Sequence, residues 1–115
     1  MGTDIVSVHR IGGMLRKHGN RFKQKTFTPD EIAYCDGKAN PAIHYAGRFA
    51  AKEAIKKCIL SSEAIDQIDF TAIEILNASN GAPVVSPINN LSTTEVKVSI
   101  SHESDYAIAM AILIL

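Results

Sequence analysis

Residues 47–57 read GRFAAKEAIKK, and this stretch decides how the rest of the chain packs. It lies inside a longer Ala-rich segment, residues 41–60, which we expect to form the longest helix. On a helical wheel with about 100° per residue, Arg48, Lys52 and Lys56 fall together and predict a solvated face. The small and apolar side chains fall on the other side and predict close packing against a neighbouring element.

Two charged residues of this helix fall at the edge of its apolar side. Glu53 and Lys57 have the i, i+4 spacing of a helical ion pair, so one interpretation is a simple surface pair. Charges beside a buried face are costly unless a partner compensates them, and Asp4 in an apolar segment poses the same problem. Two carboxylates and one ammonium that converge would suit a divalent cation with a phosphate. The spacing alone leaves both interpretations open.

The sequence before this helix predicts one strand and two helices. Residues 2–6 are β-branched and favour a first strand, after which Ser7 caps a helix that we expect to end at Gly19. Residues 28–31, TPDE, combine an N-cap Thr, a Pro at the first helical position and a Glu three residues after the cap. A short helix therefore begins there and is expected to stop near Gly37.

The second half of the chain changes to a period of two. Residues 73–75 alternate, residues 80–81 are an Asn-Gly turn pair and residues 84–85 are apolar, which together predict a hairpin. Residues 96–101 alternate as a half-buried strand, and residues 106–115 form the last strand. This order predicts an α+β fold in which amino-terminal helices pack on a mostly antiparallel sheet.

The composition is that of an ordinary globular protein. With 115 residues, 46% hydrophobic and 21% charged, we expect a single domain over residues 1–115. Two cysteines without C-x-x-C spacing predict reduced thiols. The longest apolar run has ten residues and no signal peptide is recognised, so we expect a soluble, cytoplasmic protein with no membrane partner.

The formal net charge is zero, but the charges are segregated along the chain. Residues 1–58 hold eleven Lys or Arg and five acids, giving +6, whereas residues 59–115 hold one Lys and seven acids, giving −6. Either the first half binds an anionic partner or the two halves neutralise each other across one surface. Aromatic residues make up only 6% and Trp is absent, which disfavours nucleic-acid binding.

Three segments together resemble one known family. Residues 2–5, GTDI, are similar to a G-x-D-I/V motif, residues 47–57 to an F/W-A-A-K-E-A-x-x-K helix, and residues 99–102 to an S-I-S-H motif. In this order they resemble the holo-acyl-carrier-protein synthases, which are small single-domain 4′-phosphopantetheinyl transferases. The resemblance spans nearly the whole chain and implies the fold of that family.

The resemblance also implies an activity. It implies transfer of 4′-phosphopantetheine from coenzyme A to a serine of apo acyl carrier protein, release of adenosine 3′,5′-bisphosphate, and a place in fatty acid biosynthesis. Asp4 and Glu53 would bind Mg²⁺, and Lys57 would contact the pyrophosphate. Arg48 and His102 would hold coenzyme A phosphates.

Further residues and partners are implied in the same way. The backbone at Gly81 and Pro83 would flank the adenine, while Arg10 and Arg21 would bind the acidic carrier protein. Glu53, Lys57 and His102 would form the catalytic group, and the base that deprotonates the serine is a metal-bound water, Glu53 or His102. The family implies a homotrimer with active sites between subunits. A non-catalytic phosphate- or nucleotide-binding module is the main alternative, because it would share the basic residues.

Overall fold

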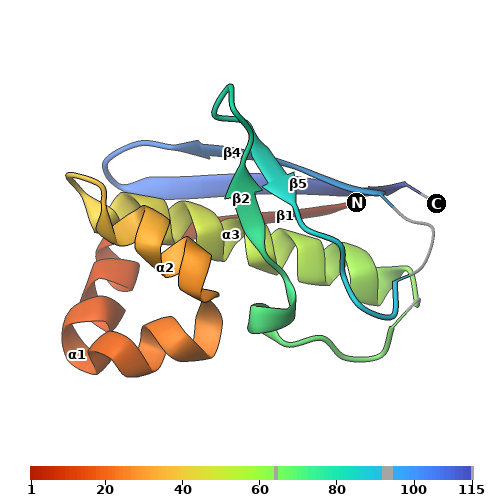
Figure 1. Ribbon diagram of the computed structural model, residues 1–115, viewed down its shortest axis with the longest axis horizontal. Helices are drawn as coiled ribbons and strands as arrows, with labels where there is room; N and C mark the ends of the chain where they lie inside the picture. Colours follow the sequence, from red (N-terminus) through yellow and green to blue (C-terminus); the bar gives the residue numbers. More distant parts are fainter. Residues whose placement is uncertain (64, 92–94, 115) are drawn as a thin grey trace.

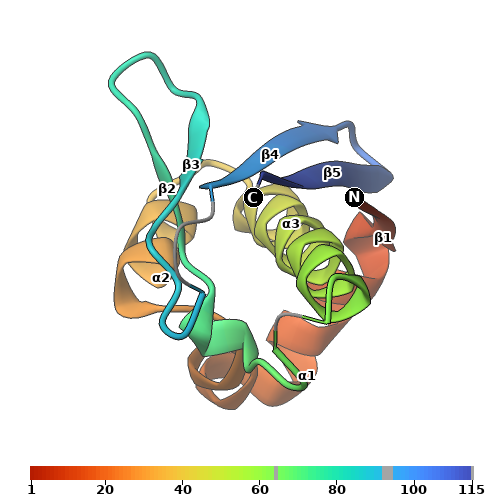
Figure 2. The same cartoon turned by 90° about the vertical axis from the view of Figure 1, so that its right-hand side faces the viewer.

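The Ala-rich helix is the central element of the structure. A computed structural model describes residues 1–63, 65–91 and 95–114, and in it α3, Pro41–Ser61, is the longest helix (Figure 1). A sheet covers one side of α3, while two further helices and a hairpin surround its other sides (Figure 2). None of the helices in the described part of the chain is both long and apolar enough to cross a lipid bilayer.

The sheet has three antiparallel strands in the order β1-β5-β4, which are Gly2–Ser7, Tyr106–Ile114 and Glu95–His102. Strand β5 alternates strictly, so that its alanines at positions 107, 109 and 111 are buried against α3. Gly2 pairs with Ala111, and a Cβ at Gly2 would lie 2.1 Å from the carbonyl oxygen of Ala54. Small residues therefore allow β1 and β5 to pack directly on the helix backbone.

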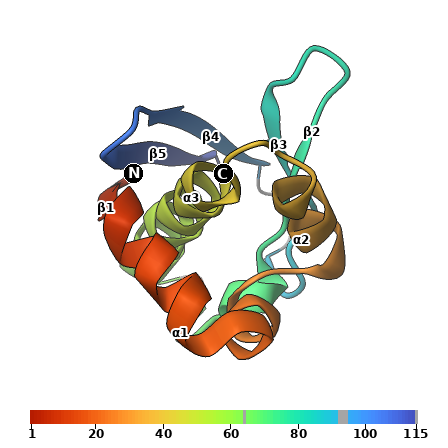
Figure 3. The same cartoon turned by 90° about the vertical axis from the view of Figure 1, so that its left-hand side faces the viewer.

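Helix α1, Val8–Thr26, begins as predicted at the Ser7 cap, whose Oγ accepts a hydrogen bond from the Arg10 N–H at 3.2 Å. The expected end at Gly19 is wrong. Gly19 leaves the helical region with φ 50° and ψ −127°, but helical structure resumes and continues to Thr26 (Figure 3). The second part forms because Phe22 is buried in the core.

Helix α2, Pro29–Asp36, carries the predicted capping box between Thr28 and Glu31. It is followed by α3 and by a short 3-10 helix, η1, Phe70–Ala72. The predicted hairpin consists of β2, Ile75–Asn77, and β3, Pro83–Val85, with Gly81 at φ 88° in its turn. This hairpin is a separate two-stranded sheet that rises beside β4.

The wheel-based prediction of a solvated face at Arg48, Lys52 and Lys56 is wrong for the first two. Lys52 is 0% exposed, Arg48 is 6% exposed and Lys56 is half-buried. The reason is the position of α3, which is enclosed both by the sheet and by α1, α2 and η1. The hydrophobic periodicity of a single helix predicts which side is apolar. It does not predict which other elements cover the charged side.

The fold class is confirmed. Helices and a mostly antiparallel sheet form the predicted α+β arrangement. Both cysteines are free, as the sequence predicts, and the structure buries both of them. Burial raises the pKa of the Cys35 thiol to about 12, so this thiol stays protonated at neutral pH.

Candidate functional site

The first group of charged residues lies where β1 runs beside α3. Gly2 and Val6 are buried, so Asp4 belongs to the same side of β1 and faces the helix. Lys57 donates hydrogen bonds of 3.0 Å to the Asp4 carboxylate and of 3.0 Å to the Thr3 carbonyl. The Asp4 side chain is only 17% exposed, while that of Lys57 is 55% exposed. The ammonium therefore covers the carboxylate from the solvent side.

Glu53 lies one turn before Lys57 on the same helix and is half-buried. The ion pair of Lys57 is formed with Asp4 on the neighbouring strand, so the convergence of a strand carboxylate with the helix is confirmed. Within the described ranges no group of three or more His, Cys, Asp or Glu side chains could hold a metal ion. Mg²⁺ is usually held by one or two carboxylates together with substrate phosphates and water, so a site for this ion does not require such a group.

The second group surrounds a small cleft of about 140 Å³ at the amino-terminal half of α3. The cleft is lined by Tyr34, His44, Gly47, Arg48, Asn77, Gly81, Pro83, Ile100 and His102. Four predicted coenzyme A-binding residues, at positions 48, 81, 83 and 102, are thus brought together from α3, the hairpin and β4. A Cβ at Gly47 would lie 3.2 Å from Ile100 and 3.7 Å from His102, so this glycine allows the end of β4 to approach the helix.

Arg48 is held rigidly at the floor of this cleft. Its guanidinium donates to the Asn77 carboxamide oxygen and lies 4.5 Å from the centre of the Tyr34 ring. Its Nε has no hydrogen-bond partner among the described residues, although the side chain is almost fully buried. A buried cationic donor that is left unpaired is costly, and an anion that enters the cleft would satisfy it.

Two histidines meet at the mouth of the same cleft. The His44 and His102 rings lie edge to face with centroids 5.4 Å apart, and Tyr34 packs on the other side of His44 at 5.8 Å. Burial lowers the pKa of His44, and the charges of His102, Lys38 and Arg48 lower it further. His44 was missed by the sequence analysis. Its i, i+4 spacing to Arg48 is the signal that could have found it.

A buried ion pair connects this region to the rest of the core. Lys52 Nζ lies 2.6 Å from the Glu31 carboxylate, and both side chains are 0% exposed. Lys52 also donates to the carbonyls of Thr26, Phe70 and Ile73 at 2.7–2.9 Å. Burial lowers the pKa of Lys52, against the opposing effect of the Glu31 charge.

Glu31 extends this network to the hairpin. Its carboxylate accepts one hydrogen bond from the Thr28 N–H in the capping box and another from the Ile75 N–H, both at 2.9 Å. Ile75 begins β2, and Asn77 at the end of β2 holds Arg48. The buried pair thus fixes the strand that carries the partner of Arg48.

Two predicted residues lie away from both groups. Arg10 and Arg21 are exposed on α1, on either side of the kink at Gly19. They are exposed to a partner protein, and neither belongs to the residues that line the cleft.

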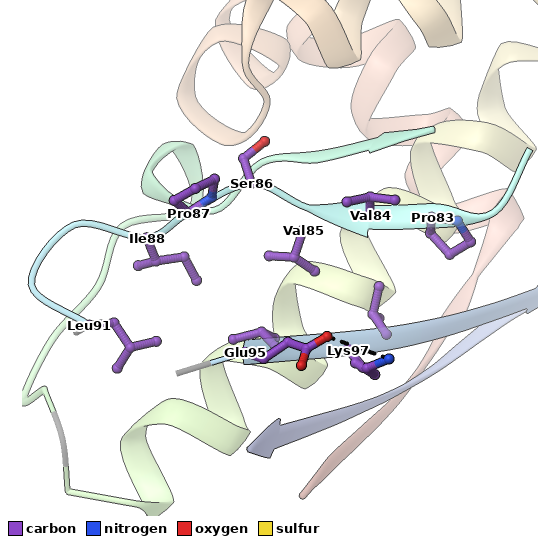
Figure 4. Close-up of a pocket in the computed structure, with 11 residues that line it drawn as sticks. Pro83, Val84, Val85, Ser86, Pro87, Ile88, Leu91, Glu95 and Lys97 are labelled. Atoms are coloured by element: carbon purple, nitrogen blue, oxygen red, sulfur yellow. Dashed lines mark ion pairs between the residues drawn. The ribbon is translucent and has the colours of Figure 1, made fainter. Parts of the chain in front are cut away.

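A larger hollow of about 680 Å³ opens between the hairpin and β4 (Figure 4). Its lining comes from residues 83–88, Leu91 and residues 95–98, and includes the apolar side chains of Val84, Val85, Ile88 and Leu91. On β4, Glu95 and Lys97 form an ion pair. Of the predicted site residues only Pro83 belongs to it. The charged and predicted site residues gather instead in the small cleft and in the group around Asp4 and Lys57, which together we take as the candidate site.

The outer face of strand β5 is apolar. The alternation that buries the alanines of β5 leaves its large side chains on the opposite side, at 42–54% exposure. These residues are Tyr106, Ile108, Met110, Ile112 and Ile114, and Ile5 of β1 joins them opposite Ile108. An exposed apolar face of this kind is typical of a surface that contacts another protein or a membrane.

Comparisons with known proteins agree with this arrangement. A family model described as the 4′-phosphopantetheinyl transferase superfamily matches residues 1–111, so the fold and the site define a protein of this class. A holo-[acyl-carrier-protein] synthase of Protochlamydia amoebophila is 42% identical, over 97% of this chain and 94% of its own length. The corresponding protein of Chlamydia pneumoniae is 37% identical over 97% of this chain and 93% of its own length.

A solved structure is similar over the same extent. The Helicobacter pylori holo-[acyl-carrier-protein] synthase in complex with coenzyme A superimposes with a TM-score of 0.84, at 29% identity and 97% coverage of both chains. The chain described here belongs to the holo-[acyl-carrier-protein] synthase family.

Proposed function

We propose that this protein transfers the 4′-phosphopantetheine group of coenzyme A to a serine hydroxyl of an apo acyl carrier protein and releases adenosine 3′,5′-bisphosphate. The observation that carries the proposal is the arrangement along α3. Asp4, Glu53 and Lys57 lie toward one end, and the cleft with Arg48 and His102 lies toward the other. Coenzyme A likewise carries two separate anionic groups, a pyrophosphate and a 3′-phosphomonoester.

The spacing along the helix suits such a ligand. Arg48 precedes Glu53 by five residues and Lys57 by nine, which corresponds to roughly 7 and 13 Å along the axis at 1.5 Å per residue. Lys57 would bind the pyrophosphate, and Arg48 and His102 would bind the 3′-phosphate. Gly81 and Pro83, at the hairpin turn, would flank the adenine. A module that only binds phosphate would need the cleft but not the carboxylates at the other end.

The carboxylates of Asp4 and Glu53 would hold Mg²⁺. When bound, this ion would neutralise charge on the pyrophosphate oxygens and stabilise the leaving group. Lys57 already pairs with Asp4, so it is positioned to exchange part of that contact for a pyrophosphate oxygen. Both effects act on charge that develops during phosphoryl transfer.

The attacking oxygen belongs to the carrier protein. It forms a new bond to the β-phosphorus of coenzyme A. The bond between that phosphorus and the bridging oxygen breaks, and the bridging oxygen leaves as part of adenosine 3′,5′-bisphosphate. Glu53 and His102 are the residues of this chain that could accept the serine proton, because carboxylates and imidazoles are side chains that commonly act as general bases. Glu53 is the better placed of the two, since it lies at the end of α3 where Lys57 and Asp4 meet.

The partners follow from the two remaining surfaces. Arg10 and Arg21 on α1 would contact an acidic face of the carrier protein. The apolar outer face of β5 would be covered by copies of the same chain, in a homotrimer whose active sites lie between subunits. The reaction would take place in the cytoplasm and supply fatty acid biosynthesis with its active carrier protein.

The experiment is a transfer assay read by the mass of the carrier protein. The protein is incubated with coenzyme A, Mg²⁺ and apo carrier protein, and the carrier should gain the mass of one phosphopantetheine group. Asp4→Asn and Glu53→Gln should each lower kcat by roughly a hundredfold or more, because each removes a charge that acts on the transferring group. Asp66→Asn is the matched control, because Asp66 is exposed in a loop.

Two results would contradict the proposal. If the wild-type protein bound coenzyme A and left the carrier unmodified, the protein would be a binding module. If transfer by Asp4→Asn and Glu53→Gln kept the wild-type dependence on Mg²⁺, the metal site would lie elsewhere.

A further inference from the structure

We propose that His44 is a further coenzyme A-binding residue of this protein. Together with Arg48 and His102 it would hold the 3′-phosphomonoester in the cleft, and it would take up a proton as this dianion binds. The inference rests on the proposed function and names the group that makes coenzyme A binding depend on pH.

The geometry is the first argument. His44 and His102 come from different elements, α3 and β4, yet their ring centroids are 5.4 Å apart at the same cleft. Arg48 lies one turn after His44 on the helix and lines the same hollow. An anion in the cleft beside the two rings would therefore lie next to two imidazoles and one guanidinium.

The unpaired donor is the second, independent argument. Arg48 is 94% buried, since only 6% of it is exposed, and its Nε has no hydrogen-bond partner among the described residues. Its other contacts, to the Asn77 oxygen and the Tyr34 ring, hold the guanidinium plane in place. A rigid, buried guanidinium with a free donor is the form of arginine that recognises phosphate oxygens.

The electrostatic surroundings explain why a proton would be taken up. The groups that face His44 are Tyr34 of α2, Lys38 of the following connection, Arg48 of its own helix and His102 of β4. The charged ones are all cationic, and together with burial they lower the pKa of His44 in the free protein. A phosphomonoester near pH 7.5 carries between one and a half and two negative charges. Its arrival reverses the local field and favours the imidazolium.

The size and place of the cleft favour a single phosphate. Its volume of about 140 Å³ accommodates a phosphate group, and the buried Arg48 guanidinium is part of its lining. Asp4 and Lys57, which would serve the pyrophosphate, lie farther along α3. The phosphomonoester is the anionic group of coenzyme A that remains for the cleft.

The test compares two ligands that differ by this group alone. Binding of coenzyme A and of dephospho-coenzyme A is measured by titration calorimetry at about pH 7.5, in two buffers with different ionisation enthalpies, which gives the number of protons taken up. Wild type should take up more protons with coenzyme A than with dephospho-coenzyme A. His44→Gln should lose most of one proton from this difference. His9→Gln, at an exposed position of α1, is the matched control and should behave like wild type.

The pH dependence of affinity gives a second measurement. One fully linked proton changes Kd by about tenfold per pH unit. The coenzyme A affinity of wild type should therefore weaken more steeply above neutral pH than that of His44→Gln. His44→Lys keeps a cation without a proton that titrates near neutrality, so it should retain tight binding and lose the proton uptake.

Several results would overturn the inference. Proton uptake that is unchanged in His44→Gln, or equal for the two ligands in wild type, would remove His44 from the phosphate site. If a variant fails to fold, which a thermal melt detects, the other one carries the comparison, because only one needs to be folded for the difference to be read. Failure of wild type to produce holo carrier protein would instead overturn the proposed function. Normal transfer with His44-independent proton uptake would overturn this inference alone.

Discussion

Replacing Lys52 by methionine should destabilise the protein far more than the same substitution elsewhere on α3. Methionine keeps most of the length of the side chain and removes the ammonium group, so the change acts mainly on the ion pair. In the substituted protein the Glu31 carboxylate would be fully buried beside an apolar side chain. The carbonyls of Thr26, Phe70 and Ile73 would also lose a donor.

The magnitude follows from this burial. Breaking a fully buried ion pair by removing one partner costs about 3–5 kcal/mol, against a typical total stability of about 5–15 kcal/mol. With a urea m-value of about 2 kcal/mol per molar, the midpoint of unfolding should fall by roughly 2 M. Equilibrium urea unfolding at one fixed protein concentration measures this, because association contributes to apparent stability.

Two further variants separate the pair from its surroundings. Lys56→Met is the matched control: Lys56 is the next lysine of α3, its Nζ lies 4.0 Å from the centre of the Phe70 ring, and its loss should cost less than about 1 kcal/mol. The double variant Glu31→Gln with Lys52→Met should lose less than the sum of the two single variants, by about 2–3 kcal/mol. A Lys52→Met protein as stable as Lys56→Met would refute the reasoning.

Two other predictions concern the surfaces of the protein. Charge reversal at Arg10 or Arg21 should raise the KM for carrier protein by roughly tenfold at low salt, with little change in the KM for coenzyme A. Steady-state kinetics at two ionic strengths measure this, and a KM for carrier protein that is insensitive to salt and to reversal would place docking elsewhere. Ile112→Lys should give soluble monomers in sedimentation and no transfer activity in the assay, whereas Leu76→Lys, at an exposed position of the hairpin, should leave assembly intact. A fully active monomer would exclude active sites that are shared between subunits.

Local signals in the sequence predicted most of the elements. The Thr28 capping box, the Ser7 cap and the Asn-Gly turn of the hairpin depend only on neighbouring residues, and each is present in the structure. Strand β5 was predicted from its apolar run. Its position between β1 and β4 was not, because strand order depends on contacts between segments about a hundred residues apart.

The site was predicted where motifs carry it and missed where packing creates it. Asp4 and Lys57 converge as expected, and Arg48, Gly81, Pro83 and His102 line one cleft. The burial of Lys52 could not be read from periodicity, since its partner Glu31 comes from another helix. His44 could not be assigned to the site from the sequence, because its contact with His102 depends on how β4 packs beside α3.

The kink in α1 has a geometric consequence for the surface that we propose contacts the carrier protein. In an uninterrupted helix, Arg10 and Arg21 are eleven residues apart, and at about 100° per residue they would point within roughly 20° of each other. Gly19, at φ 50°, breaks this relation and gives the two arginines independent directions. No atom lies within 4 Å of where a Gly19 Cβ would be, so the bend depends on backbone conformation and not on a crowded contact.

The bend therefore works as a joint whose angle can be altered without touching a charge. Inserting or deleting one residue there would turn the helical segment of Arg21 by about 100° relative to that of Arg10. The buried Phe22 side chain limits how far this segment can turn. Two proteins with the same basic residues could thus differ in the carrier surfaces they accept. In this chain, the relative direction of Arg10 and Arg21 depends on Gly19, a residue that has neither a charge nor a side chain.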